Sequence, residues 1–370
     1  MKKASRLNLN NILFSIFWWI IQTISPKRGE KMLYWGLQSG AFPNRSKEDP
    51  ILATDVLGFH FNTPIGIGAG FDKQASVIDD LIFMGAGFGE FGPYTLEVEK
   101  PVTETFYLRR DKAIVVQSLG YKNVGLTTML PLFVNRRYLP NIIGIDIAST
   151  AEYEAENVKL GRVMTYMEEF DIMARKIAPY CDFITVNFSH PETELYRMVS
   201  DGSVMVPLLK RVKQAAHEAA PIQKPRILVK IPLALTPLEL PIVCQHLMDA
   251  GVDGIIVGGA LSLSQVPVKL SQKHYAGMLS GAPVKKIVVE TISKVHQFTK
   301  GQLPIIACGG VFTGMDAYEC LTAGASLIQI GTVLRYEGPK AVTKINRDLA
   351  TILRYKGLKS VSEAVGLDFY

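Results

Sequence analysis

Residues 303–332 read LPIIACGGVFTGMDAYECLTAGASLIQIGT, and this stretch contains the pattern that decides the fold. The short apolar runs at 303–307 and 326–330 are rich in β-branched residues, which is typical of buried strands. Between them, residues 314–323 have the periodicity of a helix. The stretch therefore predicts two parallel strands joined by a helix.

The same alternation is found eight times after Pro50. The predicted strands are continuous apolar runs, as parallel strands covered by helices on both faces must be. They lie at 64–68, 87–92, 141–147, 182–188, 226–231, 254–257, 303–307 and 326–330. The predicted helices lie at 74–84, 122–134, 160–178, 203–219, 236–250, 285–299, 314–323 and 338–355. Eight such units predict an α/β fold, the closed (β/α)8 TIM barrel, with a doubly wound open sheet as the alternative.

Two connections, residues 100–120 and 259–283, are too long for simple turns. We expect them to be lids or insertions that lie over one face of the barrel.

The composition excludes several classes of protein. The chain has 370 residues, of which 48% are apolar and 20% are charged, so it is neither disordered, collagen-like nor a coiled coil. Its net charge of +6 is mild, and no run of Lys and Arg indicates a nucleic-acid partner. The four cysteines lack C-x-x-C spacing, which favours a reducing compartment, and the six scattered histidines indicate no metal site.

The N-terminus differs from the rest of the chain. Residues 12–24 read ILFSIFWWIIQTI and are flanked by basic residues. A helix of this length covers about 20 Å, which is short of the roughly 30 Å hydrocarbon core of a membrane. It therefore predicts an interfacial helix with Trp18 and Trp19 at headgroup depth. A helix packed on the body of the protein is the alternative.

From this segment we expect a peripheral, membrane-associated protein on the cytoplasmic face. The predicted organisation is an N-terminal, apolar, helical, membrane-associating segment at 1–45, followed by a barrel at 46–370.

On a TIM barrel the reactive face is formed by the residues that follow each strand. Gly309 and Gly310 follow the seventh strand, and Gly331 and Thr332 follow the eighth. These glycines let backbone N–H groups approach a phosphate, and Gly281 in the preceding connection is a further candidate. Tight turns alone are the alternative interpretation.

Three ionisable side chains lie on the same face. Lys73 and Lys230 are costly to bury unpaired, so they indicate an anionic ligand or a buried ion pair. Asp72 or Glu90 could supply that pair. His190 could act as a general base near neutral pH, or it could be a surface or satisfied core residue.

Motifs on these segments carry a family resemblance. They are AGFDK at 69–73, GYKN at 120–123, N-x-S-x-P at 187–191, VKI at 229–231, LSG-x-P at 279–283, CGGV-x-x-G-x-DAYE at 308–319, YEGP at 336–339 and SV-x-EAVG at 360–366. With the apolar N-terminal segment, which is the quinone entrance in that family, they make nearly the whole chain resemble the quinone-linked, class 2 dihydroorotate dehydrogenases.

The resemblance implies an FMN-dependent oxidoreductase of pyrimidine biosynthesis, which converts dihydroorotate to orotate with a quinone as electron acceptor. The implied cofactor contacts are Ala69, Gly70, Lys73, Asn187, Lys230, Gly281, Gly309, Gly310, Gly331 and Thr332. The implied substrate contacts are Lys73, Gln117, Gly120, Tyr121, Asn187, Glu192, Gly259 and Ala260. His190 stands at the position of the family's catalytic serine.

The chain also departs from the family pattern. On the substrate side, Gln117, Glu192 and Gly259 replace Asn residues, and Ala260 replaces a Thr. On the flavin side, Pro93, Asp146, Gly258 and Gly331 replace a Thr, an Asn, a Thr and a Tyr. Each unsatisfied group on a buried polar ligand costs about 1–3 kcal/mol. The substitutions therefore predict weaker binding of the family's substrate.

Three functions remain open from the sequence. The first is an FMN-dependent dehydrogenase of this family that uses His190 as its base. The second is a flavoprotein with a different substrate. The third is a non-catalytic relative that keeps the barrel for binding. A flavin spectrum and an assay of orotate formation distinguish them.

Overall fold

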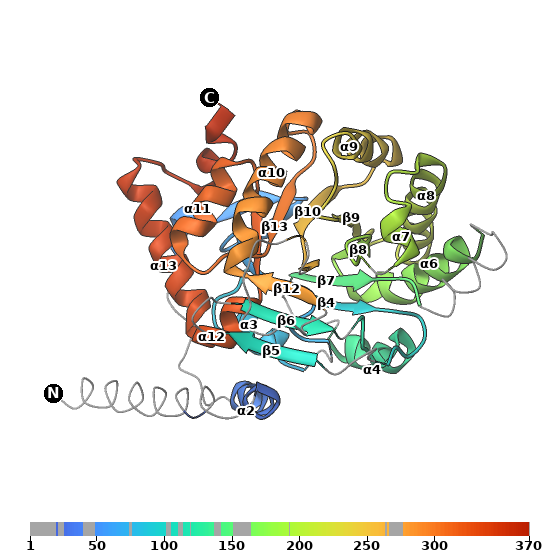
Figure 1. Ribbon diagram of the computed structural model, residues 1–370, viewed down its shortest axis with the longest axis horizontal. Coiled ribbons are helices and arrows are strands. Elements are labelled where there is room, and N and C mark those ends of the chain that lie inside the picture. Colours follow the sequence, from blue (N-terminus) through green and yellow to red (C-terminus); the bar gives the residue numbers. More distant parts are fainter. Residues whose placement is uncertain are drawn as a thin grey trace.

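The structure is a computed structural model that describes residues 20, 26–39, 49–73, 76–100, 105–109, 114–118, 120–136, 142–150, 164–191, 193–262, 265 and 277–369. Eight parallel strands close into a barrel, in which the last strand pairs with the first (Figure 1). They are β3 (Ile65–Ile67), β4 (Phe88–Tyr94), β7 (Ile142–Ile147), β8 (Phe183–Asn187), β9 (Arg226–Ile231), β10 (Gly254–Gly258), β13 (Ile305–Cys308) and β14 (Leu327–Ile330). The predicted TIM barrel is confirmed.

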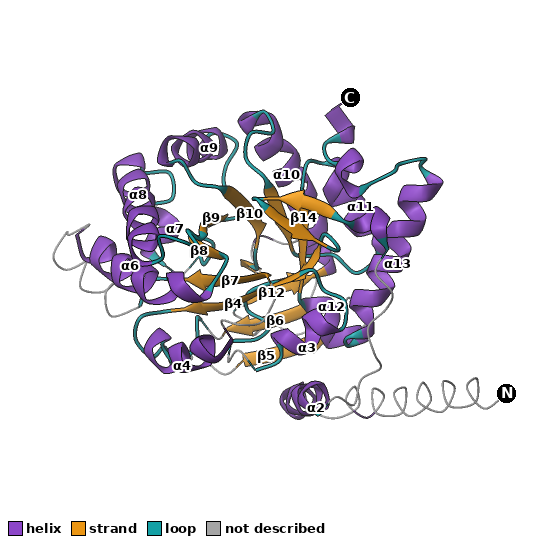
Figure 2. Cartoon of the chain, turned by 180° about the vertical axis from the view of Figure 1, so that it is seen from behind, coloured by secondary structure: helices purple, strands orange, loops and turns teal. Residues whose placement is uncertain are grey.

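Helices surround the barrel, as Figure 2 shows from the opposite side. The helices that follow the strands are α3 (Ile78–Phe83), α4 (Leu126–Arg136), α6 (Met164–Ile177), α8 (Gly202–Ala219), α9 (Glu239–Ala250), α10 (Lys285–Thr299), α11 (Gly314–Thr322) and α13 (Lys340–Tyr355). Shorter ones are α7 (Glu194–Arg197), α12 (Thr332–Glu337) and the 3-10 turns η1 (Pro50–Leu52), η3 (Ala178–Tyr180), η5 (Ala282–Val284), η6 (Val361–Ala364) and η7 (Leu367–Phe369). Each long helix overlaps the segment predicted for it.

Local sequence sets where these helices begin and end. The Thr313 hydroxyl accepts a hydrogen bond from the Asp316 N–H, and the Asp316 carboxylate accepts one from the Thr313 N–H, so a capping box starts α11. Gly251 ends α9 in the left-handed conformation that glycine adopts without strain. The capping box thus starts α11 a few residues after the glycines that follow β13, and Gly251 ends α9 before β10.

The amino-terminal end of the barrel is filled. A hairpin of β1 (Thr54–Val56) and β2 (Phe59–Phe61) carries Phe61, which packs edge-on against Phe88 with ring centroids 5.5 Å apart. A Cβ on Gly66 would lie 2.3 Å from the Phe88 ring, so only glycine makes room for it. A ligand site therefore belongs at the carboxyl end.

The two long connections join into a second sheet. Its strands are β5 (Thr105–Arg109), β6 (Ile114–Ser118), β11 (Leu261–Ser262) and β12 (Met278–Gly281), in the antiparallel order β11-β12-β6-β5. The sequence predicted insertions over one face, but it did not predict that segments more than 140 residues apart pair with each other.

The N-terminal helix α2 (Pro26–Gln38) packs on the barrel. Leu33 and Leu37 are buried in the main core, and the Tyr34 hydroxyl donates a hydrogen bond to the Phe71 carbonyl. Apart from Ile20, residues 12–24 lie outside the described residues, so the interfacial helix remains a prediction. Among the described helices, none is long and apolar enough to cross a membrane.

Candidate active site

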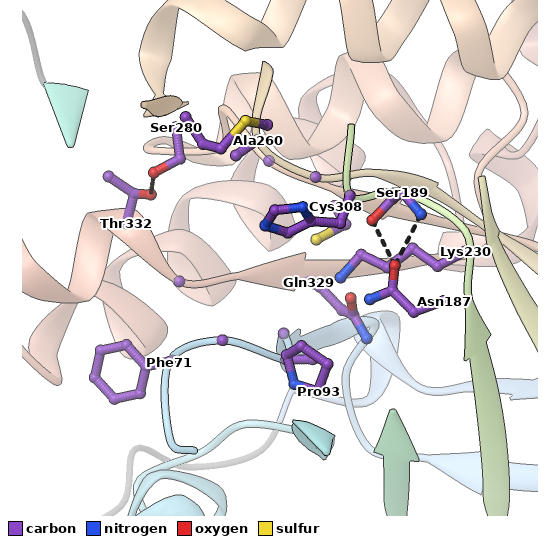
Figure 3. A pocket seen from close by; sticks show the side chains of 18 of the residues that line it. Phe71, Pro93, Asn187, Ser189, Lys230, Ala260, Ser280, Cys308, Gln329 and Thr332 are labelled. Carbon is purple, nitrogen blue, oxygen red and sulfur yellow. Dashed lines mark hydrogen bonds between the residues drawn. The ribbon is translucent and has the colours of Figure 1, made fainter. Parts of the chain in front are cut away.

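A pocket lies at the end of the barrel where the parallel strands finish (Figure 3). It has about 1090 Å³ of empty space, its open mouth included. It is lined by Gly68, Ala69, Gly70, Phe71, Lys73, Pro93, Val115, Gly120, Tyr121, Asn187, Ser189, His190, Lys230, Gly259, Ala260, Met278, Ser280, Cys308, Gly309, Gln329, Ile330, Gly331, Thr332 and Arg335. The pocket therefore occupies the face that the sequence marked as reactive.

Most of the site residues that the sequence predicted line this pocket. They are Ala69, Gly70, Lys73, Gly120, Tyr121, Asn187, His190, Lys230, Gly259, Ala260, Gly309, Gly331 and Thr332. Gly281 and Gly310 are the chain neighbours of the lining residues Ser280 and Gly309. The backbone of Gln117 pairs with Met278 across β6 and β12, but its side chain and all of Glu192 lie outside the described residues.

At one end of the pocket the backbone forms a cradle, which consists of Gly309, Gly310 and Thr332. Both glycines have positive φ angles, +118° and +78°. A Cβ on Gly310 would lie 2.5 Å from the Cα of Lys285, at the start of α10. The N–H groups of these three residues donate no hydrogen bond to any described residue, so they are available to an anion.

Lys230 lies inside the pocket in a buried ion pair. Its ammonium nitrogen is 3.7 Å from Oδ2 of Asp146, and both side chains are almost fully buried. The same Oδ2 accepts a hydrogen bond of 2.9 Å from the Asn187 amide. The partner of Lys230 is therefore Asp146, which the sequence had not named for this role.

The charges around Lys230 keep it a cation. Burial works to lower the pKa of Lys230, but the neighbouring Cys308, Asp146 and Glu90 raise this pKa overall. Burial raises the pKa of Asp146 above its ordinary value, although the charge of Lys230 opposes the shift. Lys230 therefore stays protonated in the lining of the pocket, paired with Asp146.

His190 lies in the loop that follows β8. Its ring contacts the ring of Tyr121, with centroids 4.8 Å apart and the two ring planes tilted by 53°. Burial lowers the pKa of His190 to about 4, and the positive charge of Lys73 acts in the same direction. Near neutral pH the imidazole is therefore uncharged and able to accept a proton.

Ser189, next to His190 in the chain, has its hydrogen-bonding groups occupied by a neighbouring side chain. The Ser189 hydroxyl and N–H both donate to the Asn187 side-chain oxygen at 2.8 Å. The Ser189 hydroxyl is thus committed to Asn187. In this loop the imidazole is the group suited to take a proton from a ligand.

Three glycines replace larger residues of the family, and the structure separates them. A Cβ on Gly258 would lie 1.8 Å from the Cys308 carbonyl oxygen, and its φ is +153°. A Cβ on Gly259 would meet the Ser189 hydroxyl at 3.3 Å. A Cβ on Gly331 would meet nothing within 4 Å. Of these three positions, only Gly331 would accept a Cβ without a neighbour within 4 Å.

Several lining residues were not predicted as site residues from the sequence. They include Phe71, Val115, Ser189, Met278, Cys308, Gln329, Ile330 and Arg335. One of them had a visible signal, since Gln329 is a polar residue within the apolar run SLIQI at 326–330. Val115 and Met278 come from the second sheet, whose pairing could not be read from the sequence.

Comparisons with known proteins agree with this geometry. The family model described as "Dihydroorotate dehydrogenase" matches residues 51–353. The chain is 33% identical over 360 residues to a "Dihydroorotate dehydrogenase (quinone)" of Rhodospirillum rubrum, covering 96% of this chain and 94% of the relative. It is 30% identical over 351 residues to the mitochondrial "Dihydroorotate dehydrogenase (quinone)" of Mus musculus, covering 93% and 87%.

Solved structures give the same result. The crystal structure of a ligand-free DHODH from Eimeria tenella superposes with a TM-score of 0.82 at 26% identity, and covers 93% of this chain and 99% of that one. The match of the family model over most of the chain, together with these relatives, decides the assignment. The chain belongs to the quinone-linked, class 2 dihydroorotate dehydrogenase family.

Proposed function

We propose that this protein oxidises dihydroorotate to orotate with FMN as its cofactor and a quinone as electron acceptor. Membership of the family implies a flavin, and the names of the relatives indicate the substrate and the acceptor. The observation that carries the proposal is one pocket that combines a backbone anion cradle, a buried cation and an uncharged imidazole.

The residues present fit FMN. The cradle of Gly309, Gly310 and Thr332 offers unused N–H donors of the kind that bind phosphate. The Thr332 hydroxyl donates a 3.1 Å hydrogen bond to the Ser280 hydroxyl, which links this cradle to the second sheet. Lys230 lies farther along the pocket and would face the ring system of the cofactor. When it is bound, FMN supplies the redox chemistry by accepting a hydride and releasing electrons to the quinone.

The chain itself would supply the proton chemistry. In our proposal, the imidazole of His190 takes a proton from a carbon of the substrate. Lys73, from the loop after β3, would supply the positive charge for the substrate carboxylate. Burial by Tyr121 and the surrounding pocket keeps the imidazole uncharged, so that it is a competent acceptor at neutral pH.

We expect the activity to persist into moderately acidic solution. The pKa of His190 is lowered to about 4, so its imidazole loses the free electron pair only as the pH falls toward that value. The acid limb of kcat/KM should therefore lie well below the ordinary histidine pKa of about 6.5. A pH–rate profile with an acid limb near pH 6.5 would show that His190 is not held in this environment.

A quinone would approach from the side of α2. Arg335 lies over the Phe71 ring at 5.5 Å, and the Phe71 carbonyl is tied to Tyr34 of α2. Arg335 and Phe71 both line the pocket. The wall of the pocket therefore connects the N-terminal helix with the residues around the proposed flavin site.

We also propose that residues 1–25 attach the protein to the cytoplasmic face of a membrane. Their apolar run with basic flanks is typical of an interfacial segment, and α2, which follows directly, packs on the barrel. The full chain should float with anionic phospholipid vesicles, whereas the chain that starts at residue 26 should stay unbound and keep its thermal unfolding transition. Equal flotation of both would contradict the proposal.

A second candidate is a flavoprotein with another substrate. It is favoured by Gly259 and Ala260, which line the pocket without hydrogen-bonding side chains where the family has Asn and Thr. One assay separates the two candidates: the flavin-loaded protein is mixed with dihydroorotate and a short-chain ubiquinone, and orotate is measured. Formation of orotate supports the first candidate, and a flavin-loaded protein that forms none supports the second.

A further inference from the structure

Tyr121 connects His190 with Lys73, two ionisable side chains of the pocket. It belongs to the loop that follows β6, in the second sheet, whereas His190 follows β8 of the barrel. The two rings lie against each other, with centroids 4.8 Å apart and a tilt of 53°. An aromatic ring at this distance restricts the orientations that the imidazole can adopt.

Hydrogen bonds from Lys73 hold the loop that carries Tyr121 in place. The ammonium group of Lys73 donates hydrogen bonds to the carbonyl oxygens of Gly120, at 3.3 Å, and Tyr121, at 3.1 Å. Gly120 has a φ of +54°, a left-handed conformation that glycine adopts without strain. Lys73 therefore fixes the turn from which the Tyr121 ring extends.

A buried asparagine fixes the other side of the same loop. The Asn123 amide donates to the Tyr121 carbonyl at 3.4 Å, and its oxygen accepts from the Gly125 N–H at 2.8 Å. Asn123 also pairs through its backbone with Glu99 at 3.1 Å in both directions. The backbone of Tyr121 is thus anchored on two sides, and its ring has a defined position against His190.

We propose that Tyr121 is a positioning residue for His190, and that Lys73 acts through the same loop to keep the Tyr121 ring against the imidazole. This rests on the proposed function, in which His190 is the base. Among the described residues, Lys73 from the loop after β3 and Tyr121 from the loop after β6 both act on the imidazole. The ring of Tyr121 covers the imidazole, and the charge of Lys73 disfavours its protonation.

The experiment compares three variants of the full, flavin-loaded chain with the unchanged protein. Tyr121→Phe keeps the ring, Tyr121→Leu removes it, and Tyr355→Leu changes a tyrosine that is 87% exposed on α13 as a matched control. The imidazole signals are followed by NMR on protein with labelled histidine. The His190 signal is identified by its absence from His190→Ala.

We expect Tyr121→Leu to move the His190 signal, because the ring current of Tyr121 is lost, and to shift its titration toward the ordinary range. Its kcat should fall about tenfold to a hundredfold with a smaller change in KM, as for a misplaced base. Tyr121→Phe, which keeps the ring, should leave the His190 signal close to its original position and lose much less kcat than Tyr121→Leu, and Tyr355→Leu should change neither.

The NMR readout does not depend on turnover. If the unchanged protein forms no orotate, the proposed function fails, whereas the contact between Tyr121 and His190 is still tested by the signal. If Tyr121→Leu leaves the His190 signal and titration as they are in the unchanged protein, the positioning role is overturned. If Tyr121→Phe lost as much kcat as Tyr121→Leu, the positioning role would be overturned as well. The aromatic ring, which Tyr121→Phe keeps, would then not be what positions His190.

Discussion

His190→Ala should lose about two to four orders of magnitude in turnover while it keeps its bound flavin. Within the loop after β8, the imidazole is suited to accept a proton from the substrate, since the Ser189 hydroxyl is committed to the Asn187 oxygen. Flavin retention is expected because the substitution removes no group of the cradle of Gly309, Gly310 and Thr332. Turnover is measured with dihydroorotate and a quinone, and flavin content by absorbance.

Two further variants give this prediction its controls. Ser189→Ala removes a hydroxyl next to the proposed base and should cost tenfold at most, since the Ser189 N–H still binds Asn187. His190→Ser introduces the residue that the family resemblance implies at this position, but Gly259 and Ala260 would still hold the pyrimidine poorly, so it should remain slow. A His190→Ala variant that turns over at the unchanged rate would place the base elsewhere.

Gly258→Thr should destabilise the fold by about 3 kcal/mol or more, although the family has threonine there. The new Cβ would lie 1.8 Å from the Cys308 carbonyl oxygen, and β-branched residues do not tolerate a φ of +153°. The backbone at the end of β10 would have to move away from β13. The free energy of unfolding in urea measures this cost.

Gly331→Tyr provides the matched comparison. It introduces the residue that the family resemblance implies at this position, but its Cβ would meet nothing within 4 Å, and the φ of Gly331 is negative, at −152°. Gly331→Tyr should therefore destabilise the fold less than Gly258→Thr does. Equal destabilisation by both substitutions would mean that the backbone around Gly258 does not exclude a side chain.

Much of the fold could be predicted from the sequence because the barrel is built from local signals. Each strand is a short apolar run, and each long helix has its own periodicity, so 226–231 and 285–299 were predicted with the bounds that the structure gives. The second sheet was missed because it depends on pairing between β6 and β12, which are far apart in the chain. Their pairing is specified by tertiary packing, which a window of sequence does not contain.

The candidate site shows the same division. Residues at or just after the ends of strands, such as Asn187 and Gly309, were predicted because the barrel brings all strand ends together. Val115 and Met278 were not predicted as site residues, because they reach the pocket from the second sheet. The identity of the ion pair could not be predicted either, since Asp146 and Lys230 meet only when β7, β8 and β9 lie side by side.

Anaerobic reduction of the flavin tests most directly whether this pocket oxidises dihydroorotate. The flavin-loaded protein is mixed anaerobically with dihydroorotate, in the absence of quinone, and the flavin absorbance is followed. We predict that the absorbance of the oxidised flavin falls and that orotate forms in an amount equal to the flavin reduced. A flavin that remains oxidised at saturating dihydroorotate would contradict the claim.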